Sequence, residues 1–263
     1  DRIPLAKDQK YKTMFNAQME VILNQSKGCT IQSYRIPSEK YPLFGTLEHG
    51  YFDDIEYGVD YFSGHAVIEQ LGSHKITDIS AGEMEMWETD NSDKIWVDSN
   101  REGVNFQKEM VLKENSLQLL TTISIPSKKK EIIHPFHFTL IPEGWDQESL
   151  YYGTRNGGSE IEIFPINYKD FNHGDNHSFL ISSKHGLGNT NGILIIGDKN
   201  KNLHFSINLE YSFLIPSMFY KRIDESKFLF RLIYSAQEID ETSRISDNNY
   251  QIQSTMNISY STK

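Results

Sequence analysis

The chain has 263 residues, of which 38% are hydrophobic and 24% charged, values that are ordinary for a folded globular protein and exclude general disorder. Its 36 acidic and 26 basic residues give a formal net charge of −10, which argues against nucleic-acid binding because phosphate contacts require a basic surface. No apolar run approaches the roughly 20 residues of a membrane span, and the lone Cys29 excludes an internal disulfide and a cysteine-based zinc site.

Side-chain polarity alternates with a period of two along much of the chain. In 203–209 and 250–260 apolar and polar residues alternate, which is typical of antiparallel strands with one buried face. Residues 5–18 are compatible with a short turn or helix, and 198–202 predicts a hairpin loop. Further strands are expected at 19–23, 30–36, 65–70, 83–89, 94–98, 103–112, 117–125, 132–141, 160–166, 177–183, 193–197 and 227–235.

About a dozen or more strands predict an all-β fold, a large antiparallel two-sheet supersandwich with little helix. Two tandem immunoglobulin-type domains of about 100 residues each are the structural alternative. No linker divides the chain, so we expect a single domain over 1–263. Because the sequence begins with Asp1 rather than Met, we expect a processed product or a piece of a longer protein with further domains.

The segment 47–65 interleaves aromatic and acidic residues with glycines and two histidines, and includes Tyr61 and His65. Aromatic faces beside carboxylates suit sugars, whose C–H faces stack while their hydroxyls donate hydrogen bonds. The alternative is a loop whose aromatics pack onto the sandwich while its acids stay in water. Calcium binding by these acids is a third option, although their spacing differs from the EF-hand pattern.

The segment 132–141 carries two histidines, His134 and His137. On a single strand, side chains three residues apart project to opposite faces, so this pair would not share a metal ion. We expect His134 to be structural and hydrogen-bonded, and His137 to be better placed to face a ligand. Pro135 favours a sheet edge or a bulge at this point.

Trp145 and Arg155 lie in glycine-bearing loops. Such side chains provide a large contact area for a carbohydrate or a protein partner, although they would equally cover a core. Arg231 interrupts a strand that is apolar on both sides, and a buried arginine requires an anionic partner. Glu238 and Asp240, just past that strand, are the candidates.

The predicted sandwich resembles the galactose-mutarotase-like β-supersandwich. That family includes free aldose epimerases and non-catalytic domains of glycoside hydrolases and polysaccharide lyases. The resemblance in architecture covers most of the chain. Local sequence similarity is confined to three segments: Ile133-His134-Pro135-Phe136-His137-Phe138, Phe52-Asp53-Asp54 and Ser63-Gly64-His65. It implies an acid histidine at His137 and a base at Glu238, preceded by His49 or His65. The early Asn-Arg and late Pro-Asp-Ala motifs of the epimerases are missing.

We therefore predict a carbohydrate-recognising domain of a glycan-processing protein, without cofactor or metal. The candidate stacking residues are Tyr61, Trp87 and Trp145, and the candidate polar contacts are His65, His137, Arg155 and Glu238. One alternative is an aldose 1-epimerase-like enzyme, in which His137 protonates the ring oxygen and Glu238 removes the proton of the anomeric hydroxyl. The other is a non-catalytic protein-interaction module.

Overall fold

A computed structural model describes all residues except 71, 80–82, 128, 167–169, 172–185 and 240–244. The described residues form three antiparallel sheets, so the all-β prediction is confirmed. The expected strand at 177–183 lies outside the described residues, as does Asp240.

The large sheet has ten strands and the second sheet eight, while a small sheet has three. From edge to edge, the large sheet contains β1 (Ile3–Pro4), β8 (Glu83–Glu88), β9 (Lys94–Arg101), β10 (Val104–Leu112), β11 (Ser116–Ile125), β21 (Tyr250–Thr262), β18 (Lys201–Ile207), β17 (Ile193–Gly197), β14 (Tyr151–Thr154) and β15 (Glu162–Pro165). The second sheet contains β16 (Asp170–Phe171), β19 (Ile215–Arg222), β20 (Phe228–Ser235), β13 (Phe136–Leu140), β5 (Phe44–Gly45), β4 (Thr30–Arg35), β3 (Glu20–Asn24) and β2 (Tyr11–Phe15). The small sheet contains β12 (Glu131–His134), β6 (Val67–Gln70) and β7 (Ile76–Thr77).

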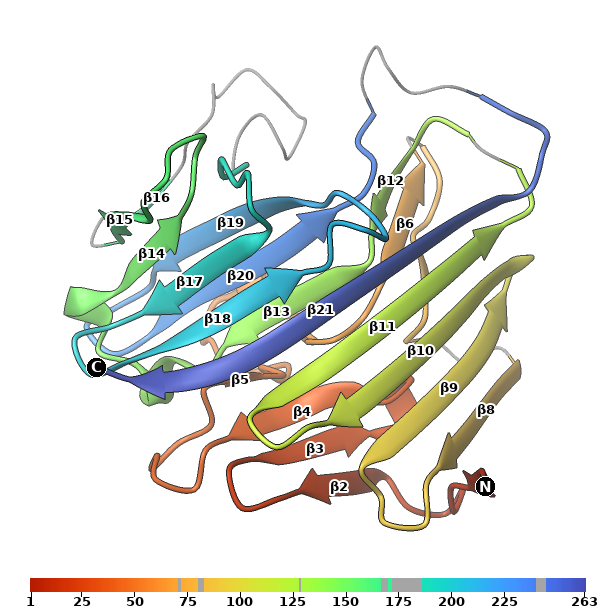
Figure 1. Ribbon diagram of the computed structural model, residues 1–263, viewed down its shortest axis with the longest axis horizontal. Helices are drawn as coiled ribbons and strands as arrows, with labels where there is room; N and C mark the ends of the chain where they lie inside the picture. Colours follow the sequence, from red (N-terminus) through yellow and green to blue (C-terminus); the bar gives the residue numbers. More distant parts are fainter. Residues whose placement is uncertain (71, 80–82, 128, 167–169, 172–185, 240–244) are drawn as a thin grey trace.

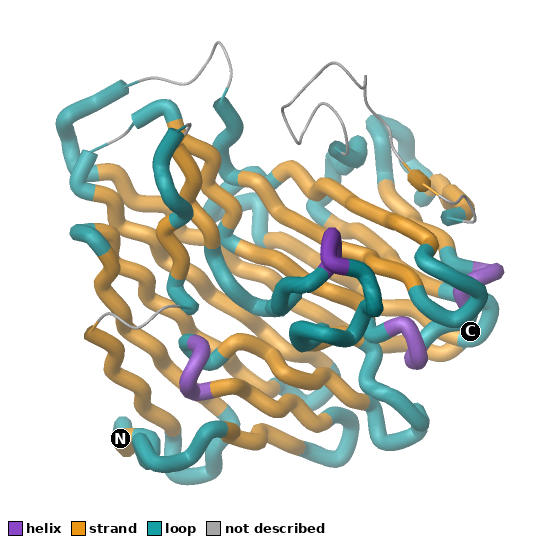
Figure 2. Tube along the Cα trace, turned by 180° about the vertical axis from the view of Figure 1, so that it is seen from behind, coloured by secondary structure: helices purple, strands orange, loops and turns teal. Residues whose placement is uncertain are grey.

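Helical structure in the described chain is limited to four short 3-10 turns. They are η1 (Gln25–Lys27), η2 (Ile55–Tyr57), η3 (Pro142–Gly144) and η4 (Gln147–Ser149). Figure 1 shows the large sheet in front and the other two behind it, and Figure 2 shows the loops that cover the second sheet from outside.

The second sheet and the small sheet pack against the same face of the large sheet. On β10, side chains at every second position point to that face: Met110 and Leu112 join the main core, while Val104 and Phe106 join a separate cluster with the small sheet. Lys108 lies between the two groups. Its cross-strand partner Thr121 and the partner of Thr121, Ser254, are also buried. A polar row therefore crosses the large sheet between its two hydrophobic cores.

Lys108 ties together three segments that face this row. Its Nζ donates to the carbonyl oxygens of Gly28 and Gly64 at 2.9 and 2.8 Å, and lies 2.9 Å from Oδ2 of Asp78. The other carboxylate oxygen of Asp78 accepts from the amide of Ala66 at 2.9 Å. Gly28 is required here because its φ is +65° and an added Cβ would lie 2.1 Å from the carbonyl oxygen of Asp78.

The expected strand 132–141 is instead two strands in different sheets. β12 ends at His134 and pairs with β6 in the small sheet, whereas β13 begins at Phe136 and pairs with β20 in the second sheet. Pro135, which has no N–H to donate, stands at the break. The sequence prediction of a single strand was therefore wrong.

Other differences concern short or irregular segments. Residues 5–18 contain strand β2 rather than a helix, and strands β14 and β19 were not predicted. The hairpin at 198–202 is confirmed, because β17 and β18 pair on either side of it. In β14 and β19 polar and apolar residues do not alternate cleanly, and β14 is buried along its whole length, so a period of two could not reveal them.

Replacing Lys108 by Met should lower the free energy of unfolding by about 3–5 kcal/mol, because it leaves the buried Asp78 carboxylate without its cation. Urea unfolding followed by circular dichroism measures this change. Lys113→Met, in the exposed turn between β10 and β11, is the control and should change stability little. Adding Asp78→Asn to Lys108→Met should cost less than the sum of the two single changes; strict additivity would contradict the coupling.

Candidate functional site

The second sheet and the small sheet meet at a seam above the polar row of Lys108. Four titratable side chains lie there, which we call the seam cluster: His65, His134, His137 and Glu238. His65 immediately precedes the small sheet, His134 ends β12, His137 lies on β13 and Glu238 follows β20. The chain crossing at Pro135 is what brings His134 and His137 together.

The rings of the seam cluster form a contiguous chain. His65 and His137 are stacked, with ring centroids 4.5 Å apart and planes 18° from parallel. The centroids of His134 and His137 are 5.5 Å apart, which corrects the expectation that their side chains project to opposite sides. Nε2 of His134 lies 3.0 Å from Oε1 of Glu238, so His134 is hydrogen-bonded as predicted.

Arg231 closes the outer side of the cluster. Its Nη1 donates to the carbonyl oxygen of Phe62 at 2.9 Å and to Oγ1 of Thr139 at 2.7 Å, and its Cζ lies 5.6 Å from the centroid of the half-buried Tyr61 ring. The predicted anionic partner Glu238 pairs with His134 instead. Among the described residues, which do not include the other candidate Asp240, the oxygens that Nη1 contacts are a carbonyl and a hydroxyl.

Burial and nearby cations keep two of the histidines neutral. The pKa of His65 is held well below its usual value, first by burial and then by the positive charges of Arg231 and Lys108. Burial likewise lowers the pKa of His137, with additional contributions from His65 and Arg231. Burial lowers the pKa of Arg231 to about 10, so it remains charged at neutral pH.

The seam cluster is almost closed to solvent. The exposed fractions of His65, His134, His137 and Glu238 are between 5 and 7%. Among the described residues, neither ring nitrogen of His65 has a partner at hydrogen-bonding geometry. A polar group buried in this way is costly unless water or a ligand satisfies it.

The segment 47–65 forms an open hollow beside the cluster. This hollow has a volume of about 260 Å³ and is lined by residues that include Glu48, His49, Asp60 and Phe62. A second hollow of about 500 Å³ shares Glu48 and His49 with it. We call the two together the 47–65 hollow.

Several polar groups in the 47–65 hollow are held in place. The amide of His49 donates to Oδ1 of Asp60 at 2.7 Å, and Nε2 of Gln32 donates to Oε1 of Glu48 at 3.1 Å. Phe62 separates the hollow from the cluster, with its ring centroid 6.2 Å from that of His65.

The same segment also has a structural part. Phe52 and Tyr57 are buried on the second sheet with Leu47 and Leu229, while Asp53, Asp54 and Glu56 are exposed. Half of the segment thus matches the alternative in which aromatics cover the sandwich and acids stay in water. Within the described residues, no three His, Cys, Asp or Glu side chains are grouped so that they could hold a metal ion.

Three predicted site residues lie elsewhere. Trp145 is 7% exposed in the main core, and its Nε1 donates to the carbonyl oxygen of Leu43 at 2.7 Å, so its ring is covered. Trp87 is on β8 near one edge of the large sheet, and Arg155 follows β14 near the opposite edge. Neither joins the seam cluster.

Sequence reasoning missed Lys108 and Asp78, and it treated His134 as purely structural. A signal for Lys108 was available, since it is the one charged side chain among alternating apolar positions on β10. Asp78 gave no comparable signal, because the short strands around it show no periodicity.

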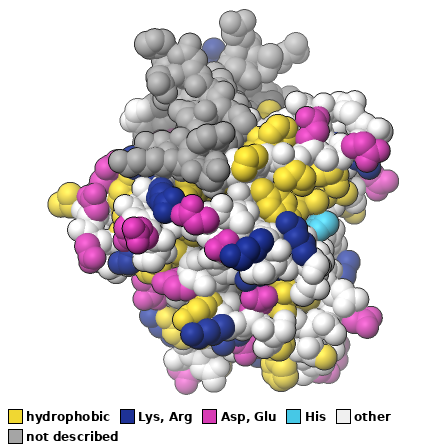
Figure 3. All heavy atoms as spheres, turned by 90° about the vertical axis from the view of Figure 1, so that its left-hand side faces the viewer, with side chains coloured by type: hydrophobic (Ala, Val, Ile, Leu, Met, Phe, Trp, Pro, Cys, Tyr) yellow, Lys and Arg dark blue, Asp and Glu magenta, His cyan; other side chains and the backbone are white. Residues whose placement is uncertain are grey.

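Two further observations concern membrane-spanning helices and the distribution of surface charge. In the part of the chain that the structure describes, no helix is long and apolar enough to cross a membrane. Figure 3 shows acidic and basic side chains interspersed over the described surface at the end of the sandwich nearest the C-terminus, together with an apolar patch.

No family model matches the chain, and no curated protein matches it in sequence. Solved structures do match its fold. A putative aldose 1-epimerase from Escherichia coli K12 aligns over 96% of this chain and 99% of its own, at 10% identity and a TM-score of 0.57. A galactose mutarotase-like protein from Lactobacillus casei ATCC 334 aligns over 95% and 100%, at 11% identity and a TM-score of 0.55.

A variant α-galactosidase from Geobacillus stearothermophilus, solved with raffinose, aligns over 97% of this chain but 41% of its own, at 8% identity and a TM-score of 0.53. At such identities the similarity concerns the fold alone. The protein is therefore an antiparallel β-sandwich of the type found in carbohydrate-related proteins. More specifically, it has the galactose-mutarotase-like β-supersandwich fold that its sequence resembles.

The neutral histidines should make stability depend on pH. Their pKa values are lower in the folded than in the unfolded state, so the unfolded chain binds more protons as the pH falls below about 6.5. The free energy of unfolding should therefore decrease between about pH 6.5 and 5, by about 1.4 kcal/mol per pH unit for each histidine. Denaturant titrations at each pH measure the slope.

His137→Gln should reduce the slope of the unfolding free energy against pH by the contribution of one histidine, about 1.4 kcal/mol per pH unit. Gln118→Ala, which removes no titratable group, is the control, and its slope should equal that of the unmodified protein. An unchanged slope in His137→Gln would show that His137 binds protons equally in the folded and unfolded states, which would contradict its lowered pKa.

Proposed function

We propose that this chain is a carbohydrate-recognising domain of a glycan-processing protein, and that a sugar binds in the 47–65 hollow at the edge of the seam cluster. The observation that carries the proposal is the open hollow itself, which combines the carboxylates of Glu48 and Asp60 with the ring of Phe62. The fold, which proteins named as epimerases and galactosidases share, supports it.

The chemistry of the hollow suits a neutral sugar. Carboxylate oxygens accept hydrogen bonds from hydroxyl groups, and charge-assisted bonds of this kind are stronger than neutral ones. Lys10 and Gln32 also line the hollow and supply donors. The aromatic ring of Phe62 offers a face for the C–H groups of the sugar.

The protonation state and burial of the seam cluster argue against catalysis by its histidines. A histidine whose pKa is far below neutrality carries no proton to give to a ring oxygen, which weakens His137 as a general acid. Glu238 lies against His134, and both are nearly closed to solvent. The adjacency of His134, His137 and Glu238 is the observation that favours the epimerase alternative, which requires these buried groups to become accessible to a sugar.

Saturation-transfer NMR of the chain with mixed neutral mono- and oligosaccharides should show binding without faster anomeric exchange. Glu48→Gln should weaken binding by roughly tenfold, the equivalent of losing one charge-assisted hydrogen bond. Trp145→Phe is the control: it alters a buried indole and should leave affinity unchanged.

Two results would contradict this proposal. Binding of no sugar would favour the protein-interaction alternative. Accelerated anomeric exchange that disappears in His137→Ala would establish the epimerase alternative instead.

A further inference from the structure

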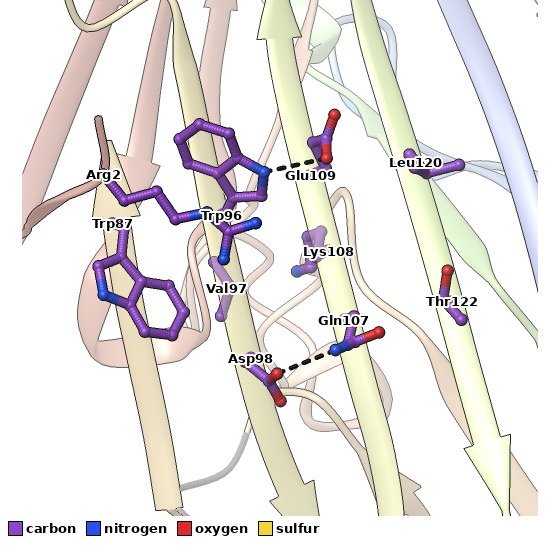
Figure 4. A pocket seen from close by; sticks show the side chains of 10 residues that line it. All are labelled: Arg2, Trp87, Trp96, Val97, Asp98, Gln107, Lys108, Glu109, Leu120 and Thr122. Carbon is purple, nitrogen blue, oxygen red and sulfur yellow. Dashed lines mark hydrogen bonds between the residues drawn. The ribbon is translucent and has the colours of Figure 1, made fainter. Parts of the chain in front are cut away.

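A separate hollow, which is not part of the 47–65 hollow, lies on the outer face of the large sheet. Trp87 on β8 and Trp96 on β9 are direct cross-strand partners, both are partly exposed, and a space of about 150 Å³ lies against them. Figure 4 shows the two indoles beside the guanidinium of Arg2. The Cζ of Arg2 is 4.6 Å from the centroid of Trp96 and 5.6 Å from that of Trp87.

The next row of side chains on this face is polar. Asp98, Gln107, Thr122 and Gln253 are successive cross-strand partners on β9, β10, β11 and β21. Neighbouring strands lie about 4.8 Å apart, so the row extends across four strands from the edge of the hollow. Nε2 of Gln107 donates to Oδ2 of Asp98 at 3.0 Å, which fixes the orientation of both groups.

Carboxylates at the hollow select the charge of a ligand. Nε1 of Trp96 donates to Oε2 of Glu109 at 3.0 Å, and Asp98 accepts from the amides of both Asn105 and Gln107. Asp98 also lines a neighbouring hollow of about 750 Å³, together with Glu85. Lys94 pairs with Glu109, which leaves Asp98 and Glu85 as the acids that disfavour phosphate or uronate ligands. The polar row disfavours an apolar protein surface or lipid.

The remaining chemistry is that of sugar recognition. Partly exposed indoles present faces to C–H groups, while amide, hydroxyl and carboxylate groups together donate and accept hydrogen bonds. Arg2 and Lys94 lie over Trp96, and Lys94 also pairs with Glu109. A ligand would stack on the indoles by displacing the long Arg2 side chain, whose charged end can move into solvent.

From this arrangement we infer a second carbohydrate site: a neutral oligosaccharide binds the outer face of the large sheet, with one ring on Trp87 and Trp96 and the following units along the row from Asp98 to Gln253. The inference rests on the proposed carbohydrate function but uses a different surface. Asp98, Gln107 and Thr122 line the hollow and Gln253 lies one strand beyond it, so an oligosaccharide on the indoles reaches contacts that a monosaccharide does not.

Intrinsic fluorescence separates the two sites. The chain contains three tryptophans: Trp87 and Trp96 lie in this hollow and Trp145 lies in the core. Titration with tetra- to hexasaccharides of glucose, mannose, xylose and galactose should change the emission for at least one series. Oligogalacturonides should change it much less, because of their charge.

Variants locate the binding surface. Trp87→Ala and Trp96→Ala should each weaken oligosaccharide binding by about tenfold or more through lost stacking area. Gln107→Ala and Gln253→Ala remove one hydrogen-bonding group each without a core contact, and should weaken binding by roughly three- to tenfold. Gln118→Ala, on the same sheet face but outside the row, is the matched control and should bind normally.

The outcomes separate this inference from the proposed function. Oligosaccharide binding that needs Trp96 and Gln107 but not Glu48 supports the second site. Binding that needs Glu48 and is unaffected by Trp96→Ala and Gln107→Ala overturns the second site and leaves the proposed function standing. Binding of monosaccharides alone, in a way that needs Glu48, overturns the second site only, whereas binding of no neutral sugar of any length by NMR or fluorescence overturns both.

Discussion

The ammonium group of Lys108 is the point on which the arrangement of the sheets depends. It projects from the large sheet between two hydrophobic cores and contacts the segments of Gly28, Gly64 and Asp78. A buried charge of this kind tolerates only a geometry in which all its donors are used. The seam between the second and small sheets is therefore fixed by electrostatics, whereas the cores on either side are held by apolar contact.

The same charge determines the chemistry above it. A protonated His65 would face the cations Lys108 and Arg231, and a protonated His137 would face Arg231, both in a poorly hydrated space. Both rings are therefore neutral and stack closely. His65 and His137 thus form a neutral polar layer at the junction, and this balance changes when they take up protons.

Periodicity predicted most of the strands, because one buried face per strand imposes a period of two. It could not predict which strands share a sheet. The sequence predicted that His134 and His137 point to opposite faces, because side chains three residues apart do so within one strand. That expectation does not apply here, because the chain passes from one sheet to another at Pro135. Pairings such as His134 with Glu238 join residues about a hundred positions apart, and no local pattern encodes them.

The tryptophans also show that the sequence alone does not distinguish a surface aromatic residue from a core one. Trp87, in a predicted strand, and Trp145, in a predicted loop, were both expected to be sugar-stacking surfaces, yet one lies on the outer face of a strand and the other fills the core. What distinguishes them is the neighbour: Trp87 faces Trp96 on the outer face, where both are partly exposed, whereas Trp145 donates its indole hydrogen to a buried carbonyl. A sandwich has two outer faces, and in this protein each carries its own combination of aromatic and carboxylate groups. In the proposed function, recognition of a sugar does not require the buried histidines to be accessible, because both proposed sites lie on outer surfaces and the histidines can remain a structural layer.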